Sequence, residues 1–136
     1  MPIELKYLDG GGSLFVGTGT LTGREILSAI NAVHETEEKT RAIVFQIADF
    51  RLVEKVDISS MDIRRISERD VRTSKINQQL ITAIVAGKEV VFGLSRMWQA
   101  YSDSPSVITS VFRSMDEAEQ WIKEQIKLKD ESSPDR

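Results

Sequence analysis

Two adjacent serines, Ser59 and Ser60, are the residues of this chain best suited to regulatory chemistry. They follow Asp57 and stand where a helix is expected to begin, just beyond a strongly apolar stretch. A phosphate on either hydroxyl would add about −1.5 to −2 charges at pH 7, and a helix N-terminus stabilises such an anion. Serine and aspartate also cap helices, because their oxygens accept hydrogen bonds from first-turn backbone N–H groups. The sequence leaves both interpretations open, and capping by Asp57 or Ser59 is the simpler one.

Four bulky side chains in a later segment could line a binding pocket: Phe92, Met97, Trp98 and Tyr101. Methionine and aromatic residues form adaptable pocket walls, so these residues could bind an apolar ligand. Helical spacing predicts one inward stripe, made of Val90, Val91, Leu94, Met97, Trp98 and Tyr101. A core role is therefore the alternative, and Phe92, which lies off the stripe, is the candidate for exposure.

Three arginines recur at helical spacing after the serines and could bind an anionic group or a protein partner: Arg65, Arg69 and Arg72. Three acidic residues are interleaved with them: Asp62, Glu68 and Asp70. Opposite charges within one helical turn favour a solvated face with ion pairs, which is the alternative interpretation.

The glycine-rich stretch Gly17–Gly23 lies between a predicted strand and a predicted helix, as a phosphate-binding loop would. Thr22 stands where the dinucleotide-binding fingerprint needs glycine or alanine, and the stretch has no lysine for a P-loop. Nucleotide binding is therefore not expected here.

The chain has one histidine, His34, and no cysteine. His34 is expected near the end of a helix, where a cation interacts favourably with the helix dipole. With these residues no Ser-His-Asp set, Cys-His pair or multi-histidine metal site can be assembled. Asp49 is the one acid expected at the end of a central strand. We predict a non-catalytic protein without a metal or cofactor.

Length and composition predict one globular domain. The chain has 136 residues, 40% hydrophobic and 29% charged, with a formal net charge of −3. That charge gives no support to nucleic-acid binding. No apolar run approaches the ~20 residues of a transmembrane helix, and the N-terminus lacks the pattern of a signal peptide. A cytoplasmic location is expected.

The elements follow from periodicity and from turn residues. Ile3–Leu8 and Ser13–Leu21 read as hairpin strands, and a helix capped at Thr22 should run to about Glu38. Ala42–Phe50 is apolar on both faces and reads as the central strand. A polar connection, Arg51–Val56, is expected after it.

The second half continues the alternation. The helix starting near Ile58–Ser60 should bury Met61, Ile63 and Ile66 and is followed by a strand at Gln79–Ala86. The remaining expected elements are the helix Glu89–Tyr101, a break at Ser102–Pro105, the strand Val107–Phe112 and a helix capped at Ser114. The fold class is therefore α/β, in the order β-β-α-β-α-β-α-β-α, with a mixed, mostly parallel sheet and four helices. Residues 1–128 should form the domain and residues 129–136 a flexible polar tail.

Several motifs resemble the STAS domain, and more closely its SpoIIAA-like branch. They are Gly19-Thr20-Leu21-Thr22, Gly93-Leu94-Ser95-Arg96-Met97-Trp98, Val111-Phe112-Arg113-Ser114 and Glu117-Ala118-Glu119-Gln120-Trp121-Ile122. The resemblance covers most of the domain and implies about five strands with helices packed against them. It also extends to CRAL-TRIO lipid-transfer domains. In anti-sigma-factor antagonists of this family, a serine in an Asp-Ser-Ser-Gly-like motif is phosphorylated. This chain departs from that motif, with Ile58 inserted and no glycine after the serines.

The resemblance and the residues together give two functional hypotheses. The first is a non-catalytic STAS-like module that binds a lipid or another small apolar molecule, or contacts a membrane transiently. The second is a regulator that is switched by phosphorylation of Ser59 or Ser60 and binds a protein partner. A homodimer could form through the first strand if its edge is exposed.

Overall fold

The computed structural model describes residues 3–101 and 108–131 of the chain. The strands in this part are β1 (Ile3–Leu8), β2 (Gly12–Thr22), β3 (Phe45–Asp57), β4 (Ile81–Ala86) and β5 (Ile108–Phe112). The helices are α1 (Gly23–Val33), α2 (Glu37–Ala42), α3 (Ser60–Ile76), α4 (Glu89–Tyr101) and α5 (Met115–Glu131). The α/β class is confirmed, and α2 is an additional short helix.

The described strands form one mixed sheet in the order β1-β2-β3-β4-β5. β1 and β2 pair antiparallel, as the predicted hairpin requires, and the other neighbouring pairs are parallel. Gly10 and Gly11 make the hairpin turn with φ angles of +81° and +83°, which residues with a side chain rarely adopt. Gly19, with φ of +64°, lies where the register between β2 and β3 shifts.

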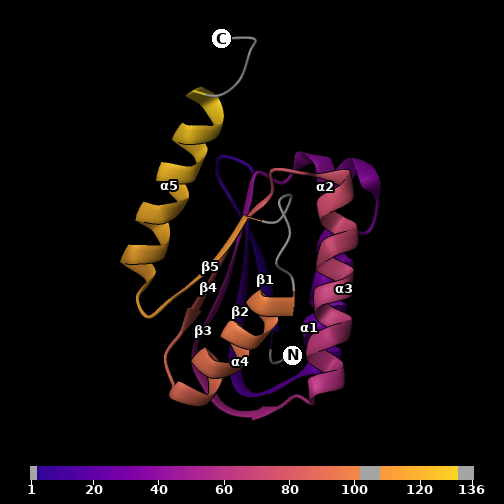
Figure 1. The fold of residues 1–136 in the computed structure, drawn as a ribbon, viewed down its shortest axis with the longest axis vertical. Coiled ribbons are helices and arrows are strands. Elements are labelled where there is room, and N and C mark those ends of the chain that lie inside the picture. The colour runs from indigo at the N-terminus through magenta and orange to yellow at the C-terminus, as the bar shows by residue number, and fades with distance from the viewer. Residues whose placement is uncertain (1–2, 102–107, 132–136) are drawn as a thin grey trace.

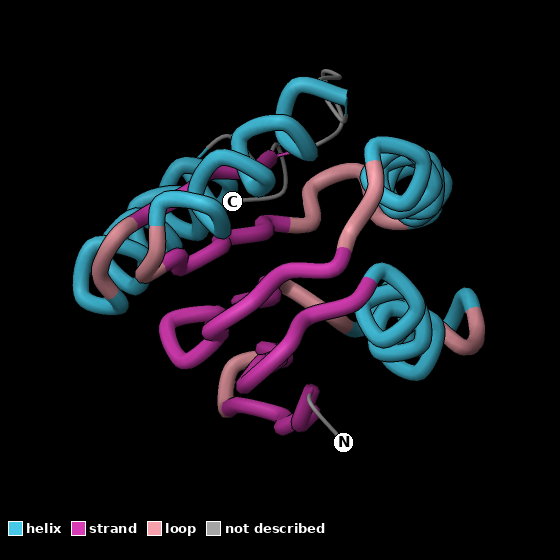
Figure 2. The backbone as a smooth tube through the Cα atoms, turned by 90° about the horizontal axis from the view of Figure 1, so that it is seen from below, coloured by secondary structure: helices cyan, strands magenta, loops and turns pink. Residues whose placement is uncertain are grey.

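Three helices cover the same face of the sheet because each connects two parallel neighbours. α1, α3 and α4 follow β2, β3 and β4, and each connection moves one strand further in the same direction. Right-handed crossovers in one direction place all their helices on one face. α5 follows the last strand and covers the opposite face (Figure 1). Figure 2 shows α1 and α3 nearly end-on, side by side along the first face.

The sheet divides the core into two apolar clusters. The larger lies beneath α1, α3 and α4 and includes Phe15, Phe50 and Trp98. The smaller lies beneath α5 and includes Ile47 and Ile122. β3 contributes to both, because successive side chains of a strand point to opposite faces. A central strand buried on both faces, as expected from the sequence, is therefore confirmed for the first half of β3.

The first helix is shorter than the sequence predicted. α1 begins at the expected cap, where Thr22 Oγ1 accepts a hydrogen bond from the Glu25 backbone N–H at 3.3 Å. It ends at Val33 rather than near Glu38, because the backbone leaves the helical conformation at His34, with φ of −105° and ψ of 37°. The His34 side chain is buried.

A second helix, α2, occupies the segment that follows. Thr36 caps it by accepting a hydrogen bond from the Lys39 backbone N–H at 3.1 Å. α2 includes Ala42, which the sequence assigned to the central strand. The sequence predicted one helix to about Glu38 and a strand from Ala42, and the charged composition of Glu37–Ala42 does not indicate a separate helix.

β3 is longer than expected at its C-terminal end. The sequence placed a polar connection at Arg51–Val56, but the strand continues through it to Asp57. This second half pairs with the end of β2 alone, and Leu52 within it is exposed. Where a strand pairs on one side only, its side chains can reach solvent. Charged residues are therefore compatible with the strand there.

α5 begins at the predicted cap, where Ser114 Oγ accepts a hydrogen bond from the Glu117 backbone N–H at 3.2 Å. It continues to Glu131, beyond the boundary at residue 128 where the sequence placed the start of a flexible tail. The rest of that tail lies outside the described residues.

A capping box opens α3. Ser59 Oγ accepts a hydrogen bond from the Asp62 backbone N–H at 3.1 Å, and Asp62 Oδ2 accepts one from the Ser59 N–H at 3.0 Å. The capping interpretation of Ser59 is confirmed. Ile63 and Ile66 are buried as expected, whereas Met61 is exposed because it lies off their face of the helix.

The cap predicts an asymmetry between the two serines. Ser59→Ala should lower the free energy of unfolding by about 1 kcal/mol, because the Asp62 N–H loses its acceptor. Ser60→Ala is the matched control and should change it by less than about 0.5 kcal/mol, since its exposed hydroxyl makes no side-chain hydrogen bond among the described residues. Urea unfolding followed by circular dichroism measures both. Equal effects of the two substitutions would contradict the assignment of the cap.

Candidate functional site

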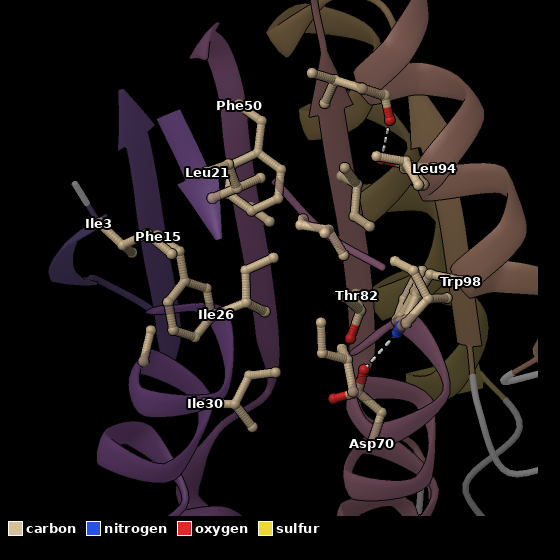
Figure 3. Close-up of a pocket in the computed structure, with 18 of the residues that line it drawn as sticks. Ile3, Phe15, Leu21, Ile26, Ile30, Phe50, Asp70, Thr82, Leu94 and Trp98 are labelled. Atoms are coloured by element: carbon tan, nitrogen blue, oxygen red, sulfur yellow. Dashed lines mark hydrogen bonds between the residues drawn. The ribbon is translucent and has the colours of Figure 1, made fainter. Parts of the chain in front are cut away.

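A cavity of about 80 Å³ lies between the sheet and the helices α1, α3 and α4 (Figure 3). Its wall is mostly apolar and draws on all three helices and on β1 to β4. The side chains that line it include Phe15, Ile26, Ile30, Phe50, Ile66, Leu94 and Trp98. Protein interiors rarely contain voids much larger than a water molecule, so a cavity of this size is a distinctive feature.

One end of the cavity is polar. Gln46 of β3, Asp70 of α3 and Thr82 of β4 line this end. The indole Nε1–H of Trp98 donates a hydrogen bond to Asp70 Oδ2 at 2.6 Å, which links α4 to α3 (Figure 3). The site therefore combines an apolar chamber with a group of hydrogen-bonding side chains.

Burial changes the acidity of Asp70. The residue is half-buried, and the packing around its carboxyl group raises its pKa from 3.8 to about 7. Exclusion of water disfavours the charged form, and the hydrogen bond from Trp98 and the charge of Arg69 offset only part of that effect. The Arg69 guanidinium is itself held elsewhere, by Asn31 Oδ1 at 2.9 Å and the His34 carbonyl at 3.2 Å.

A chain of buried polar side chains leads from the polar end to the end of α1. Gln46 Nε2 donates a hydrogen bond to Thr82 Oγ1 at 3.0 Å, and Gln46 Oε1 lies 3.0 Å from His34 Nε2. The other ring nitrogen of His34 lies 3.2 Å from Thr40 Oγ1. Burial lowers the pKa of His34, and the hydrogen bond with Gln46 opposes this only in part. His34 is therefore a buried neutral side chain and not the helix-end cation that the sequence suggested.

The four predicted pocket residues are not brought together. Trp98 is 5% exposed and lines the cavity, whereas Met97 and Tyr101 are 39% and 45% exposed. Phe92 is half-buried, with the Arg113 guanidinium 4.1 Å from its ring centroid. Trp98 is thus the one member of the predicted group on the cavity wall.

The buried stripe of α4 differs from the predicted one. Its buried residues are Val91, Ser95 and Trp98, and Val90 is exposed. A serine can face inward here because Ser95 Oγ donates a hydrogen bond to the Val91 carbonyl at 2.7 Å. The sequence prediction considered apolar residues alone and left out Ser95. The predicted buried face is therefore rotated around the helix axis relative to the observed one. The predicted break at Ser102–Pro105 lies outside the described residues.

The three predicted cationic residues differ in their surroundings. Arg69 is engaged by Asn31, His34 and Thr73 through its side chain, whereas Arg65 and Arg72 are exposed. None of the ion pairs among the described residues lies within α3, so the expected salt-bridged face is not present there. Two of the three acidic residues have other roles: Asp62 caps α3, and Asp70 is the partner of Trp98.

Asp49 lies within β3 and not at its end. Both carboxyl oxygens accept hydrogen bonds from the Arg51 side chain at 2.9 Å, on the face of the sheet that α5 covers. Burial favours a higher pKa for Asp49, but the hydrogen bonds and charge of Arg51 outweigh it and hold the pKa below its ordinary value. Asp49 is thus the carboxylate of a structural ion pair, away from the cavity.

Sequence reasoning missed Asp70 as a site residue, although the signal was present. Ile63, Ile66 and Asp70 recur at spacings of three and four, which places all of them on one helical face. A lone acid on an apolar helical face indicates either a buried partner or a binding site. The contribution of α1 to the cavity, through Ile26 and Ile30, follows from topology and not from any local motif.

The described residues contain neither a cluster suited to a metal ion nor a helix suited to crossing a membrane. Among residues 3–101 and 108–131, no group of three or more His, Cys, Asp or Glu side chains is placed to hold a metal ion. None of the described helices has the length and apolar character needed to cross a membrane.

Comparison with known proteins identifies the fold. No protein-family model matches the chain, and no curated protein sequence matches it either. A solved structure of the anti-sigma factor antagonist SpoIIAA in its unphosphorylated form is similar, with a TM-score of 0.52 and 10% sequence identity. The match covers 89% of this chain and 97% of that protein. The chain therefore has the STAS fold, as the resemblance of its motifs implied.

The raised pKa of Asp70 predicts a specific dependence of stability on pH. Between pH 4 and pH 7 the folded state binds a proton that the unfolded state has released, so this group's contribution to stability falls as pH rises through that window. Asp70→Asn removes the buried charge and keeps an acceptor for Trp98. We expect the variant to be more stable than the parent by on the order of 2 kcal/mol at pH 8, with the gain shrinking toward pH 5.

Urea unfolding at several pH values measures this difference. Glu68→Gln is the matched control, because it removes the same charge from an exposed position of the same helix. The parent also contains His34, whose lowered pKa weakens folding as pH falls below about 6.5, so only the difference between variants isolates Asp70. A gain for Asp70→Asn that is the same at pH 5 and pH 8 would contradict the prediction.

Proposed function

We propose that this protein is a non-catalytic, cytoplasmic binding module that holds a small apolar molecule between its sheet and the helices α1, α3 and α4. The supporting observation is the cavity itself. Keeping about 80 Å³ of space in a core costs on the order of 2 kcal/mol relative to close packing. The total free energy of unfolding of a domain is only about 5–15 kcal/mol, so an unfilled cavity removes a substantial part of it. A role in ligand binding accounts for the presence of the cavity.

The volume of the cavity bounds the ligand. An apolar cavity of about 150 Å³ in another protein binds benzene, and this one, at about 80 Å³, is smaller. Pockets for drug-sized ligands are typically about 300–1,000 Å³. The proposal is therefore a short or monocyclic molecule and not a long acyl chain, which would require the helices to move apart.

Binding of cyclopentane, a compact hydrocarbon, tests this function. Two-dimensional NMR should show saturable shifts of the Trp98 indole N–H, while the Trp121 indole, on the α5 side, stays unchanged. Ala48→Leu and Ala29→Leu place a larger side chain into the cavity from β3 and from α1, and each should weaken binding at least about tenfold.

Ala100→Leu is the control, because it adds the same side chain at an exposed position of α4. It should leave the binding constant unchanged. Absence of any saturable shift in the parent protein, or equal binding by the parent and both cavity-filling variants, would contradict the proposed function.

A phosphorylation-switched regulator is the second candidate, and the surroundings of Ser60 support it. Ser60 is exposed at the first position of a 17-residue helix, and its hydroxyl is not used by the cap that Ser59 forms. An anion is favoured at such a position. SpoIIAA, which has the same fold, was solved in a form described as unphosphorylated. We propose Ser60 as the phosphorylated residue and a regulatory protein as the partner.

Phosphopeptide mapping of the protein purified from its native cells tests this second candidate. Phosphate is expected on Ser60 and should be absent from the Ser60→Ala variant, which keeps the cap intact. Ser59→Ala is the complementary variant, and it should retain the phosphate. If neither serine carries phosphate under any growth condition, the switch is ruled out.

A further inference from the structure

One oxygen of the Asp70 carboxyl has no hydrogen-bond partner among the described residues. Oδ2 accepts the bond from the Trp98 indole at 2.6 Å, and this is the sole hydrogen bond that the carboxyl makes within residues 3–101 and 108–131. In Figure 3 the other oxygen points away from Trp98. Asp70 lines the cavity, so a ligand could provide the missing donor.

The neighbouring polar groups are largely engaged. Gln46 uses its oxygen toward His34 and its amide N–H toward Thr82. Ser95, also on the cavity wall, donates its hydroxyl to the Val91 carbonyl. Thr82 accepts the bond from Gln46, which leaves its own hydroxyl hydrogen to donate. The polar end thus offers one carboxyl acceptor and one hydroxyl donor.

This pair of groups discriminates between ligand head groups. A carboxylate ligand would meet Asp70 as a like charge in an apolar environment, which is unfavourable. An ammonium group would lose its hydration on entering the cavity, and a buried ion pair seldom recovers that loss. A hydroxyl group is neutral, can donate to Asp70 and can accept from Thr82.

We propose that the natural ligand of this cavity is a small alcohol, with its hydrocarbon part in the apolar chamber and its hydroxyl bound by Asp70 and Thr82. This inference rests on the proposed function and adds the chemical class of the ligand. It also assigns to Asp70 a role as the residue that selects a neutral head group.

Three probes with the same ring test the inference: cyclopentanol, cyclopentane and cyclopentanecarboxylate. The full chain is titrated with each at pH 8, where the Asp70 carboxyl is mainly ionised and can only accept. Arg69 is the charged group beside it on α3, and its guanidinium is held by Asn31, Thr73 and the His34 carbonyl. The shift of the Trp98 indole N–H gives the dissociation constants.

Cyclopentanol should bind about fivefold more tightly than cyclopentane, as one net hydrogen bond predicts, and at least about tenfold more tightly than the carboxylate. In Asp70→Asn the discrimination against the carboxylate should shrink, because the like charge is removed and only the cost of desolvating the carboxylate remains. The variant retains an acceptor for Trp98, so the indole signal still reports binding.

The outcomes separate the two proposals. If cyclopentane binds and cyclopentanol binds no better, the alcohol assignment is wrong and the apolar-ligand function stands. If Asp70→Asn keeps the same preference against the carboxylate, Asp70 does not select the head group. If none of the three probes binds the parent protein, both the inference and the proposed function fail.

Discussion

The handedness of β-α-β connections determines most of this architecture. β2 to β5 are consecutive neighbours in the sheet, so the three connections between them advance in one direction. Right-handed crossovers then require α1, α3 and α4 to share a face. The cavity lies between these three helices and the strands. α5 packs on the opposite face of the sheet and covers the smaller apolar cluster.

The hydrogen bond between Trp98 and Asp70 gives this arrangement its chemical character. It links α3 to α4 at the edge of the cavity and places a carboxyl group where burial raises its pKa. The polar chain through Gln46 to His34 continues from the same region to the end of α1. One Asp70 oxygen has no hydrogen-bond partner among the described residues, so it can accept a bond from a ligand in the cavity. The predicted pH dependence of stability and the proposed ligand preference thus depend on the same carboxyl group.

The sequence predicted the fold well where a pattern was local. The caps at Thr22, Ser59 and Ser114 mark helix starts through side-chain oxygens that bond the first turn, and each is present. The apolar run in the first half of β3 also identified the central strand. Prediction was weaker where tertiary context overrides composition. The second half of β3 accommodates charged residues because it pairs with β2 alone, and α2 was not predicted as a separate helix.

The candidate site was predictable only in part. Trp98 was identified from its residue type, but the rotation of α4 depends on Ser95, a polar residue that is buried because its hydroxyl bonds the helix backbone. His34 and Asp70 were both assigned to the surface by their charge. Their partners, Gln46 and Trp98, are distant in the sequence. The spacing of Asp70 with Ile63 and Ile66 indicated an inward position, but no local pattern identifies the partner.

The central claim is that an accessible apolar cavity lies beneath the three helices. A crystal structure determined under xenon pressure tests it most directly, because xenon enters apolar cavities without requiring any polar contact. We expect a xenon peak in contact with Phe15, Ile30 and Trp98, with the backbone otherwise unchanged. A core in which side chains fill this volume and no xenon is found there would contradict it.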